Sequence, residues 1–244
     1  MKRNGNIIVL TGGTSGIGLE LLRQLYDGNK IIVTSSSQSN IDKLQKNFPK
    51  VTGIVCNLGD TTSVKTFIDK CLSEFSDINI LINNAGIQNN YFFADEKDGY
   101  TKILNEITVN LISPLHLIYG LLPILLSKPN AAIVNVSSGL IYAPKKSASV
   151  YCGTKSAIHN ITKALRYQLE HTNVKVFEII PPLVDTAMTE GRGKGKITPK
   201  QLVDEFLRNF QNDKLESNIG KTKLLRLIQR ISPSLADKIM KNGL

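Results

Sequence analysis

The alternation of short apolar runs with longer helical patterns is the feature that most constrains the fold of this chain. Each apolar run is nearly continuous, as in strands that are covered on both faces. The runs lie at 6–11, 30–34, 51–56, 78–83, 131–137 and 174–180, and the helical patterns lie near 17–27, 39–47, 60–75, 98–128 and 150–171. Such alternation produces a parallel sheet with right-handed crossovers. The sequence therefore predicts a doubly wound α/β architecture of about seven strands with helices on both faces.

The length of the chain suits one domain. It has 244 residues and neither a Pro/Gly/Ser-rich linker nor an internal repeat, so we expect a single domain over 1–244. The longest apolar runs, such as 121–126, contain Pro123 and fall short of a membrane span. The basic N-terminus leads through a short apolar run directly into a glycine-rich loop, which indicates a strand rather than a signal peptide. We therefore expect a cytoplasmic protein without a transmembrane segment.

The cysteines and histidines argue against disulfide and metal sites. Cys56, Cys71 and Cys152 are odd in number and form no C-x-x-C pair, which fits a reducing compartment. The three histidines are scattered and have no H-E-x-x-H neighbour: His116, His159 and His171. We expect no metal.

The net charge of +10 would attract anions such as phosphates, acidic substrates, nucleic acid or anionic lipid. From residue 187 to the end there are 12 Lys/Arg and 6 Asp/Glu, so +6 of the charge lies in the last quarter. The sequence shows no aromatic-basic interleaving and no nucleic-acid recognition motif. We favour a solvated, lysine-rich surface over a polyanion site.

The stretch TGGTSGIG (11–18) lies at the first turn from strand to helix. A pyrophosphate bound there meets unpaired N–H groups and the positive end of the helix dipole. Gly12 permits the tight turn, Gly16 the close approach of a ligand to the backbone, and Gly18 the packing of the helix on the strand. The loop predicts a dinucleotide site in a Rossmann-type sheet; the alternative is a glycine-rich turn that binds nothing.

Thr14 and Ser15 add hydroxyl donors to this loop, and two other motifs are excluded there. The glycine spacing also fits G-x-x-x-x-G, but Leu19 and Glu20 stand where a P-loop needs Lys and Ser/Thr. No G-x-S-x-G surrounds Ser15 or Ser138, so the nucleophile elbow of a hydrolase is absent.

Tyr151 and Lys155 lie four residues apart at the start of a helical pattern, and therefore face the same way. A tyrosine with a pKa near ~10 is a poor base at neutral pH, and a nearby ammonium lowers that pKa. Ser138 ends the fifth strand, at the edge of the sheet where ligands bind, and can hydrogen-bond a carbonyl oxygen. Together these side chains indicate proton transfer to a carbonyl group. The alternatives are a tyrosine that caps the core and a serine that belongs to a turn.

In combination, these motifs resemble the classical short-chain dehydrogenase/reductase family over about residues 6–186. The matching segments are TGGTSGIG (11–18), NNAG (83–86), TVN (108–110), NVSS (135–138) and YCGTK (151–155). The resemblance implies a nicotinamide-dependent oxidoreductase that acts on carbonyl groups or secondary alcohols. It also implies that Tyr151 is the general acid/base, Lys155 its pKa modifier and a ribose ligand, Ser138 the substrate positioner and Asn110 the residue that holds a water of the proton relay.

The resemblance further implies a set of cofactor contacts. NNAG would stabilise the central sheet beside the adenosine, and PPLVDT (181–186) would lie by the nicotinamide. There the backbone of Val184 and the hydroxyl of Thr186 would hold the carboxamide. Cofactor-binding residues are expected to be Gly12, Thr14, Ser15, Gly16, Ile17, Gly18, Ser35, Ser36, Asn57, Leu58, Asn84, Ala85, Gly86, Tyr151, Lys155, Pro181, Val184 and Thr186.

Four longer segments are similar to a bacterial subgroup of these oxidoreductases that is named for its association with D-alanylation of Gram-positive cell walls. They are NAAIVNVSSGL (130–140), VYCGTKSAIHN (150–160), VKVFEIIPP (174–182) and GKTKLLRLIQRISPSLA (220–236). This similarity implies no particular substrate.

The chain departs from the family's pattern at three places. Pro182 replaces the usual glycine and removes a backbone donor. Asn57 replaces the usual acidic residue near the adenine, where its side-chain oxygen can still accept a hydrogen bond. The second strand ends in TSSSQS (34–39), without the Asp/Glu typical of NAD enzymes or the Arg of NADP enzymes. Because no carboxylate repels a 2′-phosphate and Ser35, Ser36 and Ser37 offer hydroxyls, we expect a preference for NADP over NAD.

The segment after residue 187 is expected to form a substrate lid (187–214) and a helical tail (221–241). GRGKGK (191–196) offers little to bury, so 189–197 should be mobile without ligand. ITPKQLVDEFLRNF (197–210) indicates a helix whose apolar face would close over a substrate; that face contains Leu202, Phe206 and Phe210. The tail has the pattern of a basic amphipathic helix. We expect it to pack on the domain or on a partner subunit; the alternative is that it lies on an anionic membrane.

Two function classes compete with the oxidoreductase. One is a non-catalytic dinucleotide sensor or scaffold on the same fold, which would not need Ser138 beside Tyr151 and Lys155. The other is a basic protein that binds nucleic acid or a membrane surface, for which we find no motif. The family resemblance also implies a homodimer or homotetramer with a small-molecule substrate.

Overall fold

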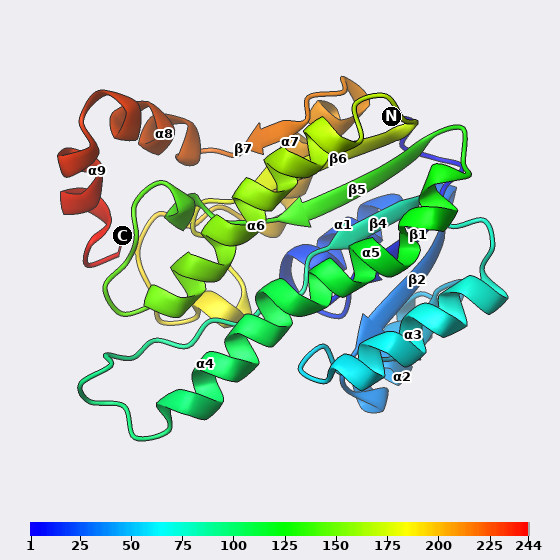
Figure 1. Cartoon of the computed structure of the whole chain (residues 1–244), viewed down its shortest axis with the longest axis horizontal. Coiled ribbons are helices and arrows are strands. Elements are labelled where there is room, and N and C mark those ends of the chain that lie inside the picture. Colours follow the sequence, from blue (N-terminus) through cyan, green and yellow to red (C-terminus); the bar gives the residue numbers. More distant parts are fainter. Residues whose placement is uncertain (244) are drawn as a thin grey trace.

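A parallel sheet forms the centre of the computed structural model, which describes residues 1–243 (Figure 1). Within these residues the sheet has seven strands in the order β3-β2-β1-β4-β5-β6-β7. Every neighbouring pair is parallel. The strands are β1 (Ile7–Thr11), β2 (Lys30–Ser35), β3 (Thr52–Val55), β4 (Ile80–Asn83), β5 (Ala131–Val136), β6 (Val174–Ile180) and β7 (Glu216–Asn218). The predicted doubly wound α/β sheet with its first six strands is confirmed.

Helices cover both faces of this sheet. They are α1 (Gly16–Leu25), α2 (Gln38–Asn47), α3 (Thr61–Glu74), α4 (Gly99–Ile107), α5 (Ser113–Leu126), α6 (Ser149–Gln168), α7 (Pro199–Gln211), α8 (Thr222–Ile231) and α9 (Pro233–Met240). Apolar side chains of α1, α2 and α7 form one core with the sheet, and those of α3, α5 and α6 form the other. The central strands are therefore buried on both sides, which is why their sequences are apolar runs rather than alternating patterns.

The strand order reverses between β1 and β4, because the chain moves outward first to β2 and β3 and then to β5 and β6. In open parallel sheets, ligands bind beyond the carboxyl ends of the strands at such a switch point. The glycine loop follows β1 there, and the NNAG segment follows β4.

The position of the seventh strand escaped the sequence analysis. β7 consists of Glu216, Ser217 and Asn218, and pairs in register with the end of β6. Ser217 and Asn218 are buried even though they are polar. A short polar strand has no apolar signal, so only its pairing with β6 identifies it.

Residues 99–126 form one continuous helical stretch in which a five-residue π-helix (Thr108–Ile112) joins α4 to α5. By length and composition alone, Gly99–Leu126 would be long enough to cross a membrane. Its Leu117, Leu121 and Leu125 are fully buried in the core beneath α3. This packing assigns the stretch to the globular domain.

The apolar face of α7 does not lie where the sequence analysis placed it. Leu202, Phe206 and Phe210 are almost fully buried in the core beside α1, and the Phe210 ring lies 4.7 Å from that of Phe177 in β6. The face therefore packs on the sheet and does not close over a substrate. Only the loop before α7 reaches the candidate site.

The tail forms two helices rather than the single expected one. Ser232 has φ −144° and ψ 84°, and Pro233 begins α9, because a residue before proline avoids helical geometry. Leu225, Ala236 and Met240 are buried against Ala143 on the domain. The other face of α8 is exposed and contains Leu224, Leu227 and Ile231. The tail thus packs by one face, beside the loop between β5 and α6 (Figure 1).

Candidate active site

The glycine loop has the geometry that its sequence implies. Gly12 has φ +65°, in the left-handed region that favours glycine. A Cβ at Gly18 would lie 2.1 Å from the Gly12 carbonyl oxygen and 2.5 Å from Asn84 Nδ2. A side chain is therefore impossible at this position without moving the loop. Gly18 thus allows the start of α1 to lie against the Gly12 carbonyl and the Asn84 side chain.

The N-terminus of α1 has unpaired hydrogen-bond donors. Ser15 occupies the N-cap position without a side-chain capping bond, so its hydroxyl and the N–H groups of the first turn remain for another acceptor. Gly16 has φ +53°, and a Cβ there would lie 3.1 Å from Thr186 Cγ2. The start of α1 and the segment after β6 are consequently in close contact. Ile17 lines the same cavity as Ser138 and Tyr151, which is described below.

The NNAG segment ties the glycine loop to the sheet. Asn84 Nδ2 donates to the carbonyls of Thr11 and Gly12 at 3.0 and 3.1 Å. The N–H groups of Asn84 and Ala85 donate to Thr11 Oγ1. A Cβ at Gly86 would lie 3.3 Å from Lys155 Nζ. The segment therefore packs between the loop and the catalytic candidates.

The residues expected near the adenosine lie at the ends of β2 and β3. Ser35 Oγ accepts from the Ser37 N–H, and Ser37 Oγ caps α2 by accepting from the Asn40 N–H. Each hydroxyl can still donate one hydrogen bond, and Ser36 is exposed. Asn57 Oδ1 accepts from the Gly59 N–H at 3.0 Å, which leaves one lone pair for another donor. Leu58 is buried next to it.

The catalytic candidates come together from the end of β5 and the first turns of α6. Tyr151, Lys155 and Ser138 are each at most 9% exposed. Lys155 Nζ donates to the Val136 carbonyl at 2.8 Å and lies 5.8 Å from the centre of the Tyr151 ring. Ser138 Oγ accepts from the Leu140 N–H at 3.2 Å. The structure brings the three residues together as the sequence predicted.

Burial dominates the electrostatics of the pair. It raises the pKa of Tyr151 to about 12, although hydrogen bonding by Ser138 and the positive charge of Arg192 act in the opposite direction. It lowers the pKa of Lys155 to about 8. The lowering of the tyrosine's pKa expected from Lys155, whose Nζ lies 5.8 Å from the ring centre, stays a prediction. A tyrosine with so high a pKa keeps its proton, which suits a general acid.

Asn110 lies in the π-helix and is 1% exposed. Its Nδ2 donates to the Ile87 carbonyl at 2.8 Å and to Thr154 Oγ1 at 3.3 Å. Its Oδ1 accepts from the Ile87 N–H at 2.9 Å. Both side-chain N–H groups are used, so a relay water would have to donate to an oxygen of Asn110. The side chain holds the segment after β4 against α6.

The sequence analysis did not identify Glu106, one turn before Asn110. It is fully buried, and Oε1 accepts from the Asn89 N–H at 3.0 Å. Within residues 1–243, Glu106 Oε2 and the nearby Tyr91 hydroxyl have no hydrogen-bond partner. Burial raises the pKa of Glu106. A charged residue on the buried face of an apolar helix was the signal that could have identified it.

A cavity of about 600 Å³ opens between these residues and the tail. Pro181, Val184 and Thr186 line it as expected, together with Ser138 and Tyr151. Arg192, in the loop before α7, also lines it; the sequence analysis had treated this arginine only as part of a mobile loop. The cavity therefore joins the catalytic candidates to the segment expected beside the nicotinamide.

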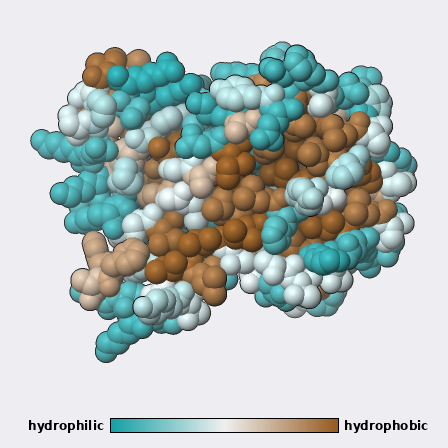
Figure 2. Space-filling model, in the orientation of Figure 1, coloured by the Kyte–Doolittle hydropathy of each residue, from teal (hydrophilic) through white to brown (hydrophobic). Residues whose placement is uncertain are grey.

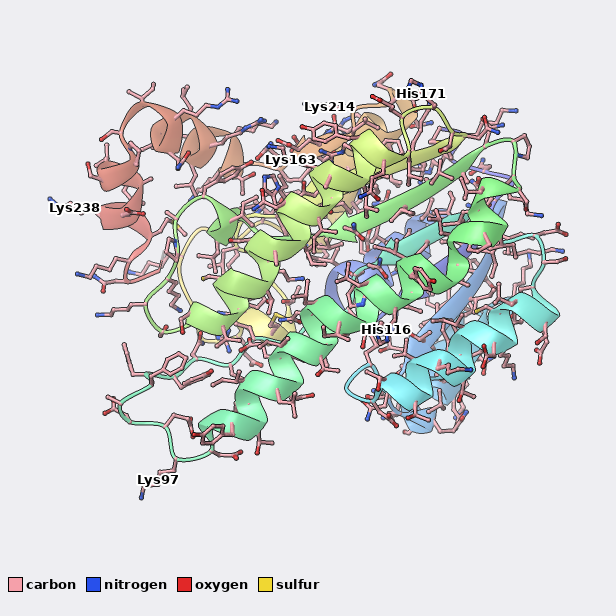
Figure 3. The ribbon with its side chains drawn as sticks, viewed as in Figure 1. Lys97, His116, Lys163, His171, Lys214 and Lys238 are labelled. Atoms are coloured by element: carbon pink, nitrogen blue, oxygen red, sulfur yellow. The ribbon has the colours of Figure 1, made fainter. Side chains whose placement is uncertain are left out.

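No group of three or more His, Cys, Asp or Glu side chains in the described part of the chain could hold a metal ion. Figure 3 shows His116 on α5 and His171 in the turn after α6, far from one another. His159 Nδ1 contacts the buried Glu178 at 2.9 Å, and Ser137 Oγ donates to the same carboxylate at 2.6 Å. His159 therefore belongs to a structural network between α6 and β6.

Comparisons with known proteins agree with this site. A family model described as short chain dehydrogenase matches residues 6–196. The uncharacterized oxidoreductase DltE of Bacillus subtilis is 34% identical over 233 residues, which cover 93% of this chain and 92% of the relative.

Two solved structures show the same fold. A short chain dehydrogenase from Burkholderia cenocepacia in complex with NADP has a TM-score of 0.85 and 23% identity, covering 96% of this chain and 97% of the other. A short chain dehydrogenase/reductase from Burkholderia phymatum in complex with NAD has a TM-score of 0.84 and 18% identity, covering 100% and 98%. The family predicted from the motifs is confirmed: this chain belongs to the short chain dehydrogenases.

Proposed function

We propose that this protein is an NADP(H)-preferring oxidoreductase that interconverts a carbonyl group and a secondary alcohol. The observation that carries this proposal is that Ser138 and Tyr151 line a substrate-sized cavity that also reaches Ile17 at the start of α1, with the buried Lys155 Nζ 5.8 Å from the centre of the Tyr151 ring. A protein that only senses a dinucleotide would not need a serine next to a buried tyrosine. The family membership supports the same reaction class.

Ser138, Tyr151 and Lys155 have different roles in substrate binding and proton transfer. The nicotinamide cofactor, when bound, supplies or takes up the hydride at the carbonyl carbon. In reduction, the Tyr151 hydroxyl gives its proton to the substrate oxygen, and Ser138 donates a hydrogen bond to that oxygen. In oxidation the proton returns to Tyr151. Lys155 is fixed by the Val136 carbonyl within reach of both the tyrosine and the Gly86 backbone.

The glycine cradle fits a dinucleotide, because side chains are excluded where its pyrophosphate would meet the start of α1. Preference for NADP is supported by the end of β2, where no carboxylate stands at 35–37. A second cleft of about 420 Å³ is lined there by Thr14, Arg23, Asn40 and Lys43. Lys43 has no ion pair within residues 1–243, whereas Arg23 pairs with Glu20 at 2.8 Å. An unpaired ammonium in this cleft, on the helix that Ser37 caps, favours a 2′-phosphate over a bare ribose.

Exposed apolar side chains on α4 and α5 support a homo-oligomer, as a dimer or tetramer. Tyr100, Leu104 and Tyr119 are 94, 68 and 85% exposed, and Figure 2 shows a broad apolar band across this face. Contiguous apolar surface of this kind marks an interface between subunits. Cytoplasmic location is supported by Cys56, Cys71 and Cys152, which are unpaired and buried.

The proposal is tested by a panel of ketones, oxo acids and secondary alcohols with NADPH or NADP. We expect NADPH consumption matched one to one by alcohol formation for some members of the panel, and tighter binding of NADPH than of NADH. Tight cofactor binding without turnover of any member would favour the sensor reading instead.

A further inference from the structure

The walls of the main cavity are apolar on the side away from the glycine loop. The first helix of the tail contributes Leu224, Leu225 and Ile228, and the second contributes Ile239 and Met240. A volume of about 600 Å³ is within the range of small-molecule sites. The tail, which lies outside the region matched by the family model, therefore forms the outer wall of the site.

The charged residues that line this cavity are all cations. Lys145 comes from the loop between β5 and α6, Arg192 from the loop before α7, and Lys221 from the start of α8. No Asp or Glu lies among the described lining residues. Within residues 1–243, none of the three cations forms an ion pair with a carboxylate, and three segments thus bring unneutralised positive charge to one apolar cavity.

Basic residues just outside the cavity differ from these three because they form ion pairs. Lys196 pairs with Asp185, Lys223 with Glu205, and Arg226 with Glu216. These three carboxylates therefore neutralise cations around the cavity rather than in it. Lys145 and Arg192 are half-buried beside apolar walls and Lys221 is exposed, so an anion that enters the cavity meets three unpaired cations.

Two of the three cations are placed by their surroundings. Arg192 is half-buried, and the Asn90 side-chain oxygen, in the orientation that its neighbours favour, lies 3.2 Å from its Nε. Its charge also reaches Tyr151 at the catalytic end. Lys221 packs against the loop before α7, where a Cβ at Gly195 would lie 2.6 Å from its Nζ. The absence of a side chain at 195 thus leaves room for the ammonium.

We propose that the substrate is an amphiphilic carbonyl or alcohol compound with an apolar body and an anionic oxygen group, either carboxylate or phosphate. This inference rests on the proposed function for the reacting group and on the cavity for the rest. The apolar body lies along Leu224, Leu225 and Ile228, and the anionic group is bound by Lys145, Arg192 and Lys221. These cations determine specificity, and none of the three donates or accepts the transferred hydride or proton.

Calorimetry on the full chain saturated with NADP tests the binding half of this inference. The probes are octanoate, octyl phosphate and the uncharged 1-octanol. We expect at least one of the anions to bind about tenfold more tightly than octanol. The two anions together show which oxygen group the cavity accepts.

Each cavity cation has a neighbouring lysine outside the cavity, which provides a matched control. Lys145→Gln, Arg192→Gln and Lys221→Gln should each weaken binding of the anion about three- to tenfold and leave octanol unchanged. Lys146→Gln, Lys194→Gln and Lys223→Gln remove the same charge from positions that do not line the cavity, and should change binding less than twofold. Equal binding of anions and octanol, or equal losses in both sets, would overturn the inference. Loss of NADPH binding in the first set would overturn it as well, because the cations would then serve the cofactor.

Turnover of 7-oxooctanoate and its methyl ester separates this inference from the proposed function. We expect a lower KM for the free acid than for the ester, with similar kcat values for the two. The difference in KM should be smaller in the three cavity variants. An ester that reacts as well as the acid contradicts the anionic substrate and leaves the reaction class intact. Absence of turnover with both compounds and with every member of the panel above, together with selective binding of octanoate, contradicts the reaction class and leaves the anion site intact.

Discussion

The two ends of the active site are built in opposite ways. On the cofactor side, backbone groups and small residues set the geometry: Gly18 admits no side chain, and Asn84 fixes the loop through two carbonyls. On the substrate side, long side chains on loops and tail helices form the walls, among them Leu224, Ile228 and Lys221. The first side tolerates almost no change, whereas the second can be altered one side chain at a time.

This difference explains which properties of the family can be assigned to this chain from its similarity alone. The match to short chain dehydrogenases covers residues 6–196 and so includes the glycine loop, Ser138, Tyr151 and Lys155. The tail helices that line the cavity lie beyond it. Reaction class therefore follows from the shared region, and we propose that the tail, together with the loop before α7 at the end of that region, determines substrate choice.

The comparison is tested most severely at Gly18. We expect Gly18→Ala to weaken NADPH binding more than about 100-fold, because the new methyl group overlaps the Gly12 carbonyl and moves the loop. Fluorescence titration of NADPH measures this effect. Gly153→Ala is a matched control, since a Cβ there meets nothing within 4 Å. Tight NADPH binding by Gly18→Ala would contradict the rigid cradle.

Lys155, at the junction of the two sides, gives the next largest effect. Burial lowers its pKa to about 8 from 10.5. Between these values the unfolded chain carries a proton that the folded chain has lost, so stability rises with pH through this window. Without cofactor, we expect the wild type to gain about 2 kcal/mol relative to Lys155→Met between pH 8 and 10.5. Urea unfolding of both proteins at several pH values measures this difference in the free energy of unfolding. A difference that does not change with pH would show that folding does not lower the pKa of Lys155.

Cofactor choice sharpens the comparison at the end of β2. Ser35→Asp should reverse the preference from NADPH to NADH, by about tenfold, because a carboxylate repels the 2′-phosphate and accepts from the ribose hydroxyls. Ser36→Arg should strengthen the preference for NADPH. Paired titrations with NADPH and NADH on each variant provide the test. Tighter binding of NADH by the wild type would refute the assignment.

The smallest expected effect lies on the substrate side. Leu225→Ala loosens the tail where it packs on Ala143, and should raise KM about fivefold while NADPH affinity stays unchanged. Leu227→Ala, on the exposed face of α8, should leave KM unchanged. Steady-state kinetics on both variants compare them. If Leu225→Ala alters NADPH binding as strongly as KM, the two sides are not separable.

Much of the cofactor side could be predicted from the sequence, because each of its requirements selects one residue type at a fixed spacing. Gly12 needs a positive φ, and Gly18 needs an absent side chain. On the substrate side, no position requires one particular residue type. The same apolar pattern at Leu202, Phe206 and Phe210 fits a lid or a core helix, and only tertiary packing decides between them. Arg192 and Glu106 were missed because their roles depend on distant neighbours.

The mobility expected for 189–197 is a separate prediction. The loop is closed by pairing of Asp185 N–H with the Ile197 carbonyl at 2.9 Å and of Lys196 Nζ with the Thr189 carbonyl at 2.7 Å. Gly191, Gly193 and Gly195 all have positive φ values, from 58 to 68°. We propose that the segment 187–198, rather than α7, acts as the lid. Hydrogen exchange in this loop that slows on addition of NADP and substrate would support it, and unchanged exchange would contradict it.

Tyr151→Phe provides the most direct test of the central claim that the buried tyrosine is the proton donor of a carbonyl reductase. The substitution keeps the ring and removes only the transferable proton. We predict that turnover of a substrate identified in the panel falls by about 10²- to 10⁴-fold, while the Kd for NADPH stays within about twofold of wild type. A variant that binds NADPH normally and reduces the same substrate at near wild-type rates would contradict the account.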